Sequence, residues 1–166
     1  QNGEAIFSCS ISFQKREKGL KHQIKMPKIQ GPEKLKSDLE LRKDLQSKIP
    51  KDYLPMWLRE REIETRQVEP VDLLKAEKLP PYRSTWMKPT GKLPSDERIH
   101  QALLLYVSDM GLLGAAVNPH EVNFMSKKFQ SASLDHVMWF HGKVNFNNWV
   151  LHHMHSPISQ NARGFS

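Results

Sequence analysis

The chain has 166 residues with 25 basic and 18 acidic side chains, which gives a formal net charge of +7. Because domains contain about 100–200 residues, this length corresponds to one domain, or to one domain with part of another. The single cysteine, Cys9, excludes an internal disulfide framework and a Cys-based zinc ribbon. We find no apolar run that reaches the roughly 18 residues that a membrane helix requires.

The positive charge is unevenly distributed. Residues 1–100 carry 21 basic and 15 acidic side chains, whereas residues 101–166 carry four and three. Within the first stretch the signs are mixed, as over residues 34–44, and this mixture is typical of a solvated helix face. Nucleic acid binding favours blocks of one sign, so we expect no nucleic-acid partner.

The first 60 residues divide into two parts. Over residues 5–13 apolar side chains alternate with serines, which predicts a strand with one buried face, so we expect the chain to begin inside a sheet. The charged stretch 14–60 is interrupted by prolines and is interpreted as a connection between folded units. One amphipathic helix is predicted between Pro32 and Pro50.

The remaining sequence predicts one helix among several strands. Two short strands are expected at 62–69 and 82–88, where prolines bound them. Residues 95–113 predict a helix with Ser95 as N-cap, and apolar residues on nearly every face indicate that a sheet wraps it. Further strands are predicted at 129–141, 149–155 and 162–166, and together these elements define an α+β fold.

Asp109 is the first candidate for chemistry. It lies at the C-terminal end of the predicted helix, where the helix dipole disfavours a carboxylate. One interpretation is an acidic residue at a frayed helix end that reaches solvent. The other is a general base, or a carboxylate that orients water, at the rim of the core.

Two further groups carry reactive side chains. Ser133, Asp135 and His136 lie close together in sequence, but strand alternation would place His136 on the opposite face, so we expect no covalent serine hydrolase. A hydroxyl of Ser133 that binds substrate or water is the alternative. The histidines of 152–155 are too few on one strand face for a zinc site, so we expect no metal.

Several motifs together resemble the acyl-CoA thioesterase II family, including its peroxisomal branch. Residues 131–141, Ser-Ala-Ser-Leu-Asp-His-Val-Met-Trp-Phe-His, resemble the family's Asp-His-x-Met-Trp-Phe-His signature. Residues 106–113, Tyr-Val-Ser-Asp-Met-Gly-Leu-Leu, resemble its helix motif. The start, 1–14, is similar to the last strand of the family's first domain, and residues 162–165 match the opening of a late strand.

The resemblance implies a fold of two tandem hotdog domains, each a long helix wrapped by an antiparallel sheet. Residues 1–27 would end the first domain, 28–60 would form a charged linker, and 61–166 would form a truncated second domain. The implied activity is hydrolysis of fatty acyl-CoA to free fatty acid and CoA, without a cofactor or metal. Residue matching implies that Asp109 and Ser133 are catalytic, together with a Gln that the family carries beyond the segment matching 163–165.

These implications lead to the hypothesis that the chain is part of a longer enzyme of fatty acid metabolism. The alternative is an inactive hotdog remnant that acts as a binding or dimerisation module. We also expect a homo-oligomer formed through the sheets, no insertion into a membrane, and an intracellular location. The peroxisomal matrix is the compartment that the family's peroxisomal branch implies.

Overall fold

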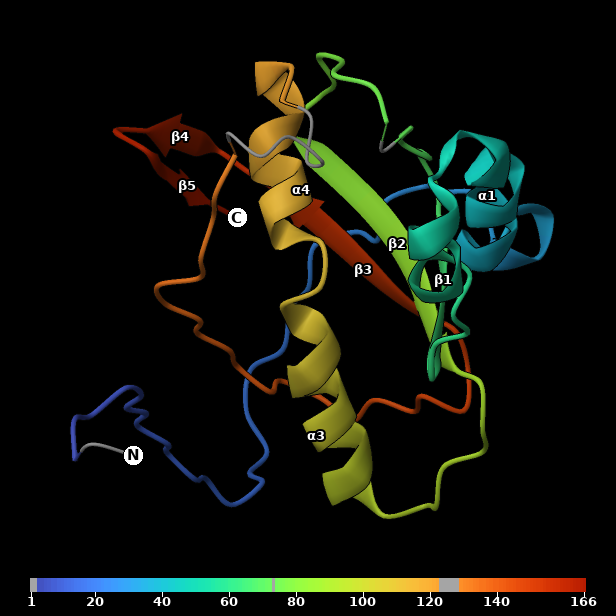
Figure 1. The fold of residues 1–166 in the computed structure, drawn as a ribbon. Coiled ribbons are helices and arrows are strands. Elements are labelled where there is room, and N and C mark those ends of the chain that lie inside the picture. Colours follow the sequence, from blue (N-terminus) through green and yellow to red (C-terminus); the bar gives the residue numbers. More distant parts are fainter. Residues whose placement is uncertain (1–2, 73, 123–128) are drawn as a thin grey trace.

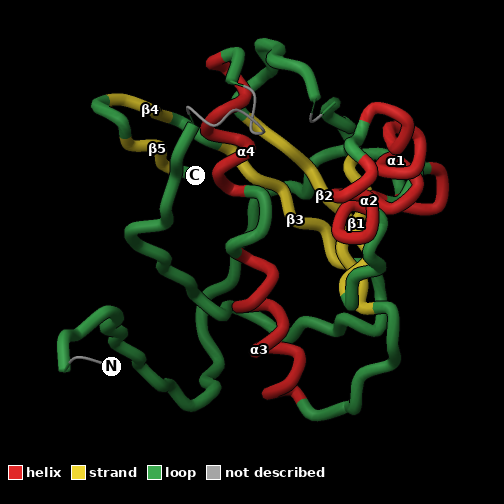
Figure 2. Tube along the Cα trace, in the orientation of Figure 1, coloured by secondary structure: helices red, strands yellow, loops and turns green. Residues whose placement is uncertain are grey.

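The computed structural model describes residues 3–72, 74–122 and 129–166 of the chain. The strands are β1 (Ile63–Gln67), β2 (Tyr82–Pro89), β3 (Val150–His155), β4 (Ile158–Gln160) and β5 (Arg163–Phe165), and the helices are α1 (Asp38–Leu45), α2 (Leu54–Trp57), α3 (Glu97–Ser108) and α4 (Leu112–Val117), with short 3-10 turns at Pro32–Lys34, Gln46–Lys48, Lys51–Tyr53 and Asn118–His120. An antiparallel sheet has the strand order β1-β2-β3. In Figure 1 α4 lies in front of β2 and β3, and α3 lies below α4, beside the sheet. Loops make up much of the remaining trace (Figure 2).

The main core lies between this sheet and α3. Strand alternation and the register place Ile63 of β1 and Met87 of β2 on one face of the sheet. They pack with Val107 of α3 and with Phe146, which precedes β3 and has no exposed surface. Burying such a side chain contributes about 1.5–3 kcal/mol, so this cluster is the contact that holds α3 on the sheet.

The opposite face of the sheet contacts the segment that was predicted to be a linker. Trp86 of β2 donates from its indole Nε1 to the carbonyl of Gln30 at 2.9 Å, and Arg66 of β1 donates from Nη1 to the carbonyl of Pro32 at 2.8 Å. The predicted helix of this segment is confirmed as α1, and Ser37 begins it with a capping box. The segment 28–60 is therefore packed on the sheet, while the domain boundaries stay a prediction.

Four of the predicted strands are confirmed as β1, β2, β3 and β5. The sequence did not predict β4, which pairs with β5 in a separate hairpin. Two residues connect the pair, Asn161 and Ala162, and both have a positive φ of 52° and 57°. Two positive φ values are what a type I′ hairpin turn requires. Alanine rarely adopts a positive φ, so the sequence at 161–162 lacks the Asn-Gly or Asp-Gly pair that usually identifies such a turn.

Two other predicted strands are wrong. Residues 5–13 and 129–141 belong to no strand, and most of their apolar side chains are exposed, for example Phe13 at 92% and Trp139 at 70%. A strand persists only when a neighbour pairs its backbone N–H and C=O groups. Within the described residues, no strand pairs with either segment. The alternating pattern therefore has no sheet to bury its apolar face.

Helix α3 begins one residue later than predicted. Its N-cap is Asp96, whose side chain accepts from the backbone N–H of Arg98. The Arg98 guanidinium, hydrogen-bonded to the carboxylate, holds the pKa of Asp96 down at about 2. The cap therefore stays ionised at neutral pH, as an acceptor at a helix N-terminus requires.

The expectation that a sheet wraps this helix is not met within the described residues. Tyr106 is 64% exposed and Leu105 is 48% exposed, so no described strand covers their side of α3. The segment Glu97–His120, with 24 residues, is also long and apolar enough to cross a membrane, contrary to our expectation for this chain. A core helix of a globular protein meets the same criterion. Two polar residues, Ser108 and Asp109, lie in the middle of this segment, where α3 ends.

Gly114 of α4 lies directly against the half-buried side chain of Arg83. A methyl group at Gly114 would overlap the guanidinium of Arg83, whose Nη2 donates to Gln67 Oε1 at 2.7 Å. Overpacking costs about 1–3 kcal/mol, and alanine in a helix interior returns up to about 1 kcal/mol, so we expect Gly114→Ala to lower the free energy of unfolding by about 1–2 kcal/mol. Urea denaturation measures this loss. Gly142→Ala is the matched control, because nothing lies within 4 Å of a methyl group there; equal losses in both variants would contradict the overlap.

Candidate active site

The candidate site forms where the chain leaves α3 and enters α4. Asp109 is the C-cap of α3, and Gly111 adopts a left-handed conformation with φ of 92°. A side chain at Gly111 would be strained by this φ, and its Cβ would lie 3.1 Å from Met154 Sδ. Glycine is thus required for the break, and the break places Asp109 between two helices with a side chain that is 61% exposed.

The imidazole of His136 lies against this helix end. Its Nε2 is 3.0 Å from the hydroxyl of Ser108, and its Nδ1 is 3.7 Å from Asp109 Oδ1. The same Ser108 hydroxyl is 2.7 Å from the carbonyl of Leu105, to which it donates. One histidine ring therefore contacts both of the last two residues before the break. The sequence alone indicated no role for His136, because its contacts to Ser108 and Asp109 cross 27 or more residues.

Ser133 lies in the extended segment that carries His136. Its side chain is exposed and forms no hydrogen bond to any described residue. Three residues of extended chain span at most about 10 Å, so the contacts of His136 bring the backbone of Ser133 to the neighbourhood of Asp109. The segments that carry Asp109 and Ser133 therefore lie close together, but no hydrogen bond connects the two side chains.

His152 of β3 lies on the helix-facing side of the sheet. It pairs with Thr85 in the register, between Val150 of the core and Met154, which faces Gly111. Burial lowers the pKa of His152, and electrostatic interaction with His136 and His153 lowers it further. Its buried Nδ1 has no hydrogen-bond partner among the described residues. His152 is therefore a half-buried imidazole that disfavours a positive charge.

The other histidines of β3 point elsewhere. His153 lies on the opposite face of the sheet, where its Nδ1 is 3.0 Å from the hydroxyl of Ser84. Within the described parts of the chain, no group of three or more metal-ligating side chains occurs. Strand alternation thus separates His152 from His153.

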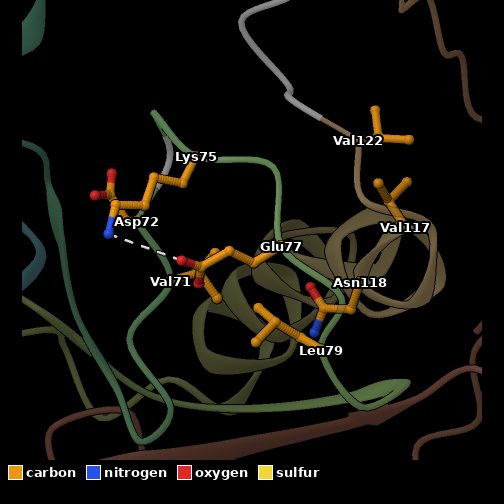
Figure 3. A pocket seen from close by; sticks show the side chains of 8 residues that line it. All are labelled: Val71, Asp72, Lys75, Glu77, Leu79, Val117, Asn118 and Val122. Carbon is orange, nitrogen blue, oxygen red and sulfur yellow. Dashed lines mark ion pairs between the residues drawn. The ribbon is translucent and has the colours of Figure 1, made fainter.

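Two hollows in the described part of the chain lie away from Asp109. Figure 3 shows one between the 71–79 segment and the C-terminal end of α4, where Lys75 and Glu77 are paired at 3.8 Å. A second hollow lies beside Ala116 and His120, also at the end of α4. Asp109 precedes the opposite end of that helix, so neither hollow is part of the candidate site.

A family model for acyl-CoA thioesterase matches residues 57–166. The chain belongs to the acyl-CoA thioesterase family. This match covers all of the sheet, α3, α4 and the segment with Ser133 and His136.

Relatives and a solved structure agree with this membership. The chain is 32% identical to acyl-CoA thioesterase 2 of Haemophilus influenzae over 166 residues, which is 100% of this chain and 58% of that protein. It is 35% identical to acyl-coenzyme A thioesterase 8 of Mus musculus over 176 residues, 99% of this chain and 53% of that protein. The crystal structure of the acyl-CoA thioesterase II TesB2 from Mycobacterium marinum matches with a TM-score of 0.64 and 26% identity, over 91% of this chain and 50% of that one. The chain spans about half the length of these relatives.

Proposed function

We propose that the protein to which this chain belongs hydrolyses fatty acyl-CoA to a free fatty acid and CoA. Membership of the acyl-CoA thioesterase family carries this proposal. The structure adds one supporting observation, which is that Asp109 lies exposed at a helix break that Gly111 requires. A carboxylate held in this way can accept a proton from water.

In the proposed reaction Asp109 is the general base and Ser133 helps to orient the water. The water oxygen attacks the thioester carbonyl carbon while one of its protons passes to the Asp109 carboxylate. The tetrahedral intermediate then expels the CoA sulfur, which takes the proton back from Asp109 as it leaves, and the fatty acid remains. A glutamine from sequence outside these 166 residues would complete the set, as the resemblance to the thioesterase II family implies.

We extend the proposal to architecture, assembly and location. The packing of α4 and of the end of α3 on an antiparallel sheet supports a hotdog domain. We assign residues 1–27 to the end of a preceding domain, as the resemblance to the family implies. The exposed apolar side chains of 5–13 support pairing with further sheet, either in the same protein or in a second copy. The proposed location is the peroxisomal matrix or the cytoplasm, without membrane insertion.

The experiment is a hydrolysis assay on the full-length protein as its gene encodes it. Straight-chain acyl-CoA esters are supplied, and the free CoA thiol is followed with a thiol-reactive chromophore. We expect turnover, and we expect Ser133→Ala to lower kcat/KM by about 100-fold, as misplacement of the attacking water does. The absence of hydrolysis for every chain length would overturn the proposal in favour of an inactive binding module. Wild-type kcat/KM in Ser133→Ala would remove only Ser133 from it.

A further inference from the structure

The contacts of Ser108 determine which nitrogen of His136 carries the proton. The Ser108 hydroxyl hydrogen is used in the bond to the Leu105 carbonyl at 2.7 Å, so its oxygen can only accept from His136 Nε2 at 3.0 Å. Nε2 is therefore the donor. A neutral imidazole has a single N–H, and Nδ1 is then left with a free lone pair.

That lone pair faces Asp109. Nδ1 and Asp109 Oδ1 are 3.7 Å apart, which is too long for a direct hydrogen bond, and both atoms are acceptors when the imidazole is neutral. Two acceptors at this separation need a donor that both can share. A water molecule has two O–H groups and meets that need.

We propose that His136 is a positioning residue for the reaction: with its tautomer fixed by Ser108, its Nδ1 holds the attacking water against Asp109. This inference rests on the proposed function. In the attack the water gives one proton to the Asp109 carboxylate, while the hydrogen bond from its other O–H to Nδ1 keeps the oxygen lone pair directed at the thioester carbonyl. The imidazole itself neither gains nor loses a proton.

The test combines kinetics with a measurement that needs no substrate. In the full-length protein, His136→Gln retains a donor near Ser108 and loses the Nδ1 lone pair. We expect it to lower kcat by about 10- to 100-fold with KM nearly unchanged, as misplacement of a reactant does. The His136 side chain is 28% exposed, so added imidazole should restore part of the activity of His136→Ala. The exposed His22→Gln variant is the matched control and should keep the wild-type kcat.

The ¹⁵N shifts of His136 provide the independent readout. We expect the Nε2–H tautomer in the wild-type protein and a mixture of tautomers in Ser108→Ala. An Nδ1–H or a doubly protonated ring at neutral pH would overturn the inference, and so would wild-type kcat in His136→Gln. If Asp109→Asn retains activity, the proposed function of Asp109 fails instead, so the two failures are distinguishable.

Discussion

Replacing Asp109 with Asn should abolish nearly all turnover of acyl-CoA while leaving the fold intact. The amide has the shape of the carboxylate but cannot take a proton from water. General bases contribute about 10²- to 10⁴-fold to rates, so we expect kcat to fall by about 1,000-fold, with a smaller change in KM. The side chain is 61% exposed and its contact with His136 Nδ1 is long, at 3.7 Å, so we expect the melting temperature to stay near that of the wild-type protein.

Asp135→Asn is the matched control for this variant. Asp135 lies one residue from His136 in the same motif and is exposed, but it has no contact with Asp109 in the described residues. We expect it to retain most of the wild-type kcat/KM in the same thiol-release assay. Equal losses in both variants would indicate a general effect of charge, and an active Asp109→Asn would remove Asp109 from the mechanism.

The site was predictable from sequence only in part. Asp109 could be identified because a carboxylate at the end of an apolar helix is locally unfavourable, and this signal lies within one turn of the chain. The contact of His136 is different, since it depends on how an extended segment crosses the helix end. Periodicity describes neighbours in sequence and carries no information on such a crossing. The period-two interpretation of 129–141 placed His136 on the opposite face of a strand from Ser133, and no strand forms there.

The same limit explains the errors in the fold. Strands β1 and β2 were predictable because prolines bound two short runs, and β3 because its run follows a turn region. All three pair with one another in a single sheet. The pattern of 5–13 is just as regular, yet no described strand pairs with it. Alternation thus reports the preference of a segment for a sheet, while the presence of a partner decides whether a strand forms. The sequence predicted an apolar helix at α3, and the helix forms. How much of its apolar surface is buried depends on the strands that pack beside it, which the local pattern does not determine.

Arg42 of α1 should contribute the largest single share to the stability of the segment packed against β1. Its side chain is almost completely buried and is paired with Asp38 at 2.9 Å. The guanidinium also donates to the carbonyls of Trp57 and Arg59, and the Trp57 indole donates back to the Arg42 carbonyl at 2.8 Å. A single cation therefore joins α1, α2 and the start of the chain into β1.

Arg42→Ala would remove this cation. The half-buried Asp38 carboxylate would lose its ion pair, and the carbonyl oxygens of Trp57 and Arg59 would lose their hydrogen-bond donor. Breaking one partner of a buried ion pair costs about 3–5 kcal/mol, so we expect a loss of that size in urea denaturation followed by tryptophan fluorescence. Arg42→Lys keeps the charge but cannot reach three acceptors at once, and its loss should be smaller. Lys43→Ala is the control on the same helix, because Lys43 is exposed.

The position of Arg42 also separates stability from catalysis. The segment that it joins lies on the face of the sheet opposite to α3, through the contacts of Trp86 and Arg66, whereas Asp109 lies on the α3 side. The folded fraction of Arg42→Ala should therefore keep the wild-type kcat at low temperature and lose it only as it unfolds. A loss of kcat without unfolding would show that the packing on the far face of the sheet determines the position of the helix break.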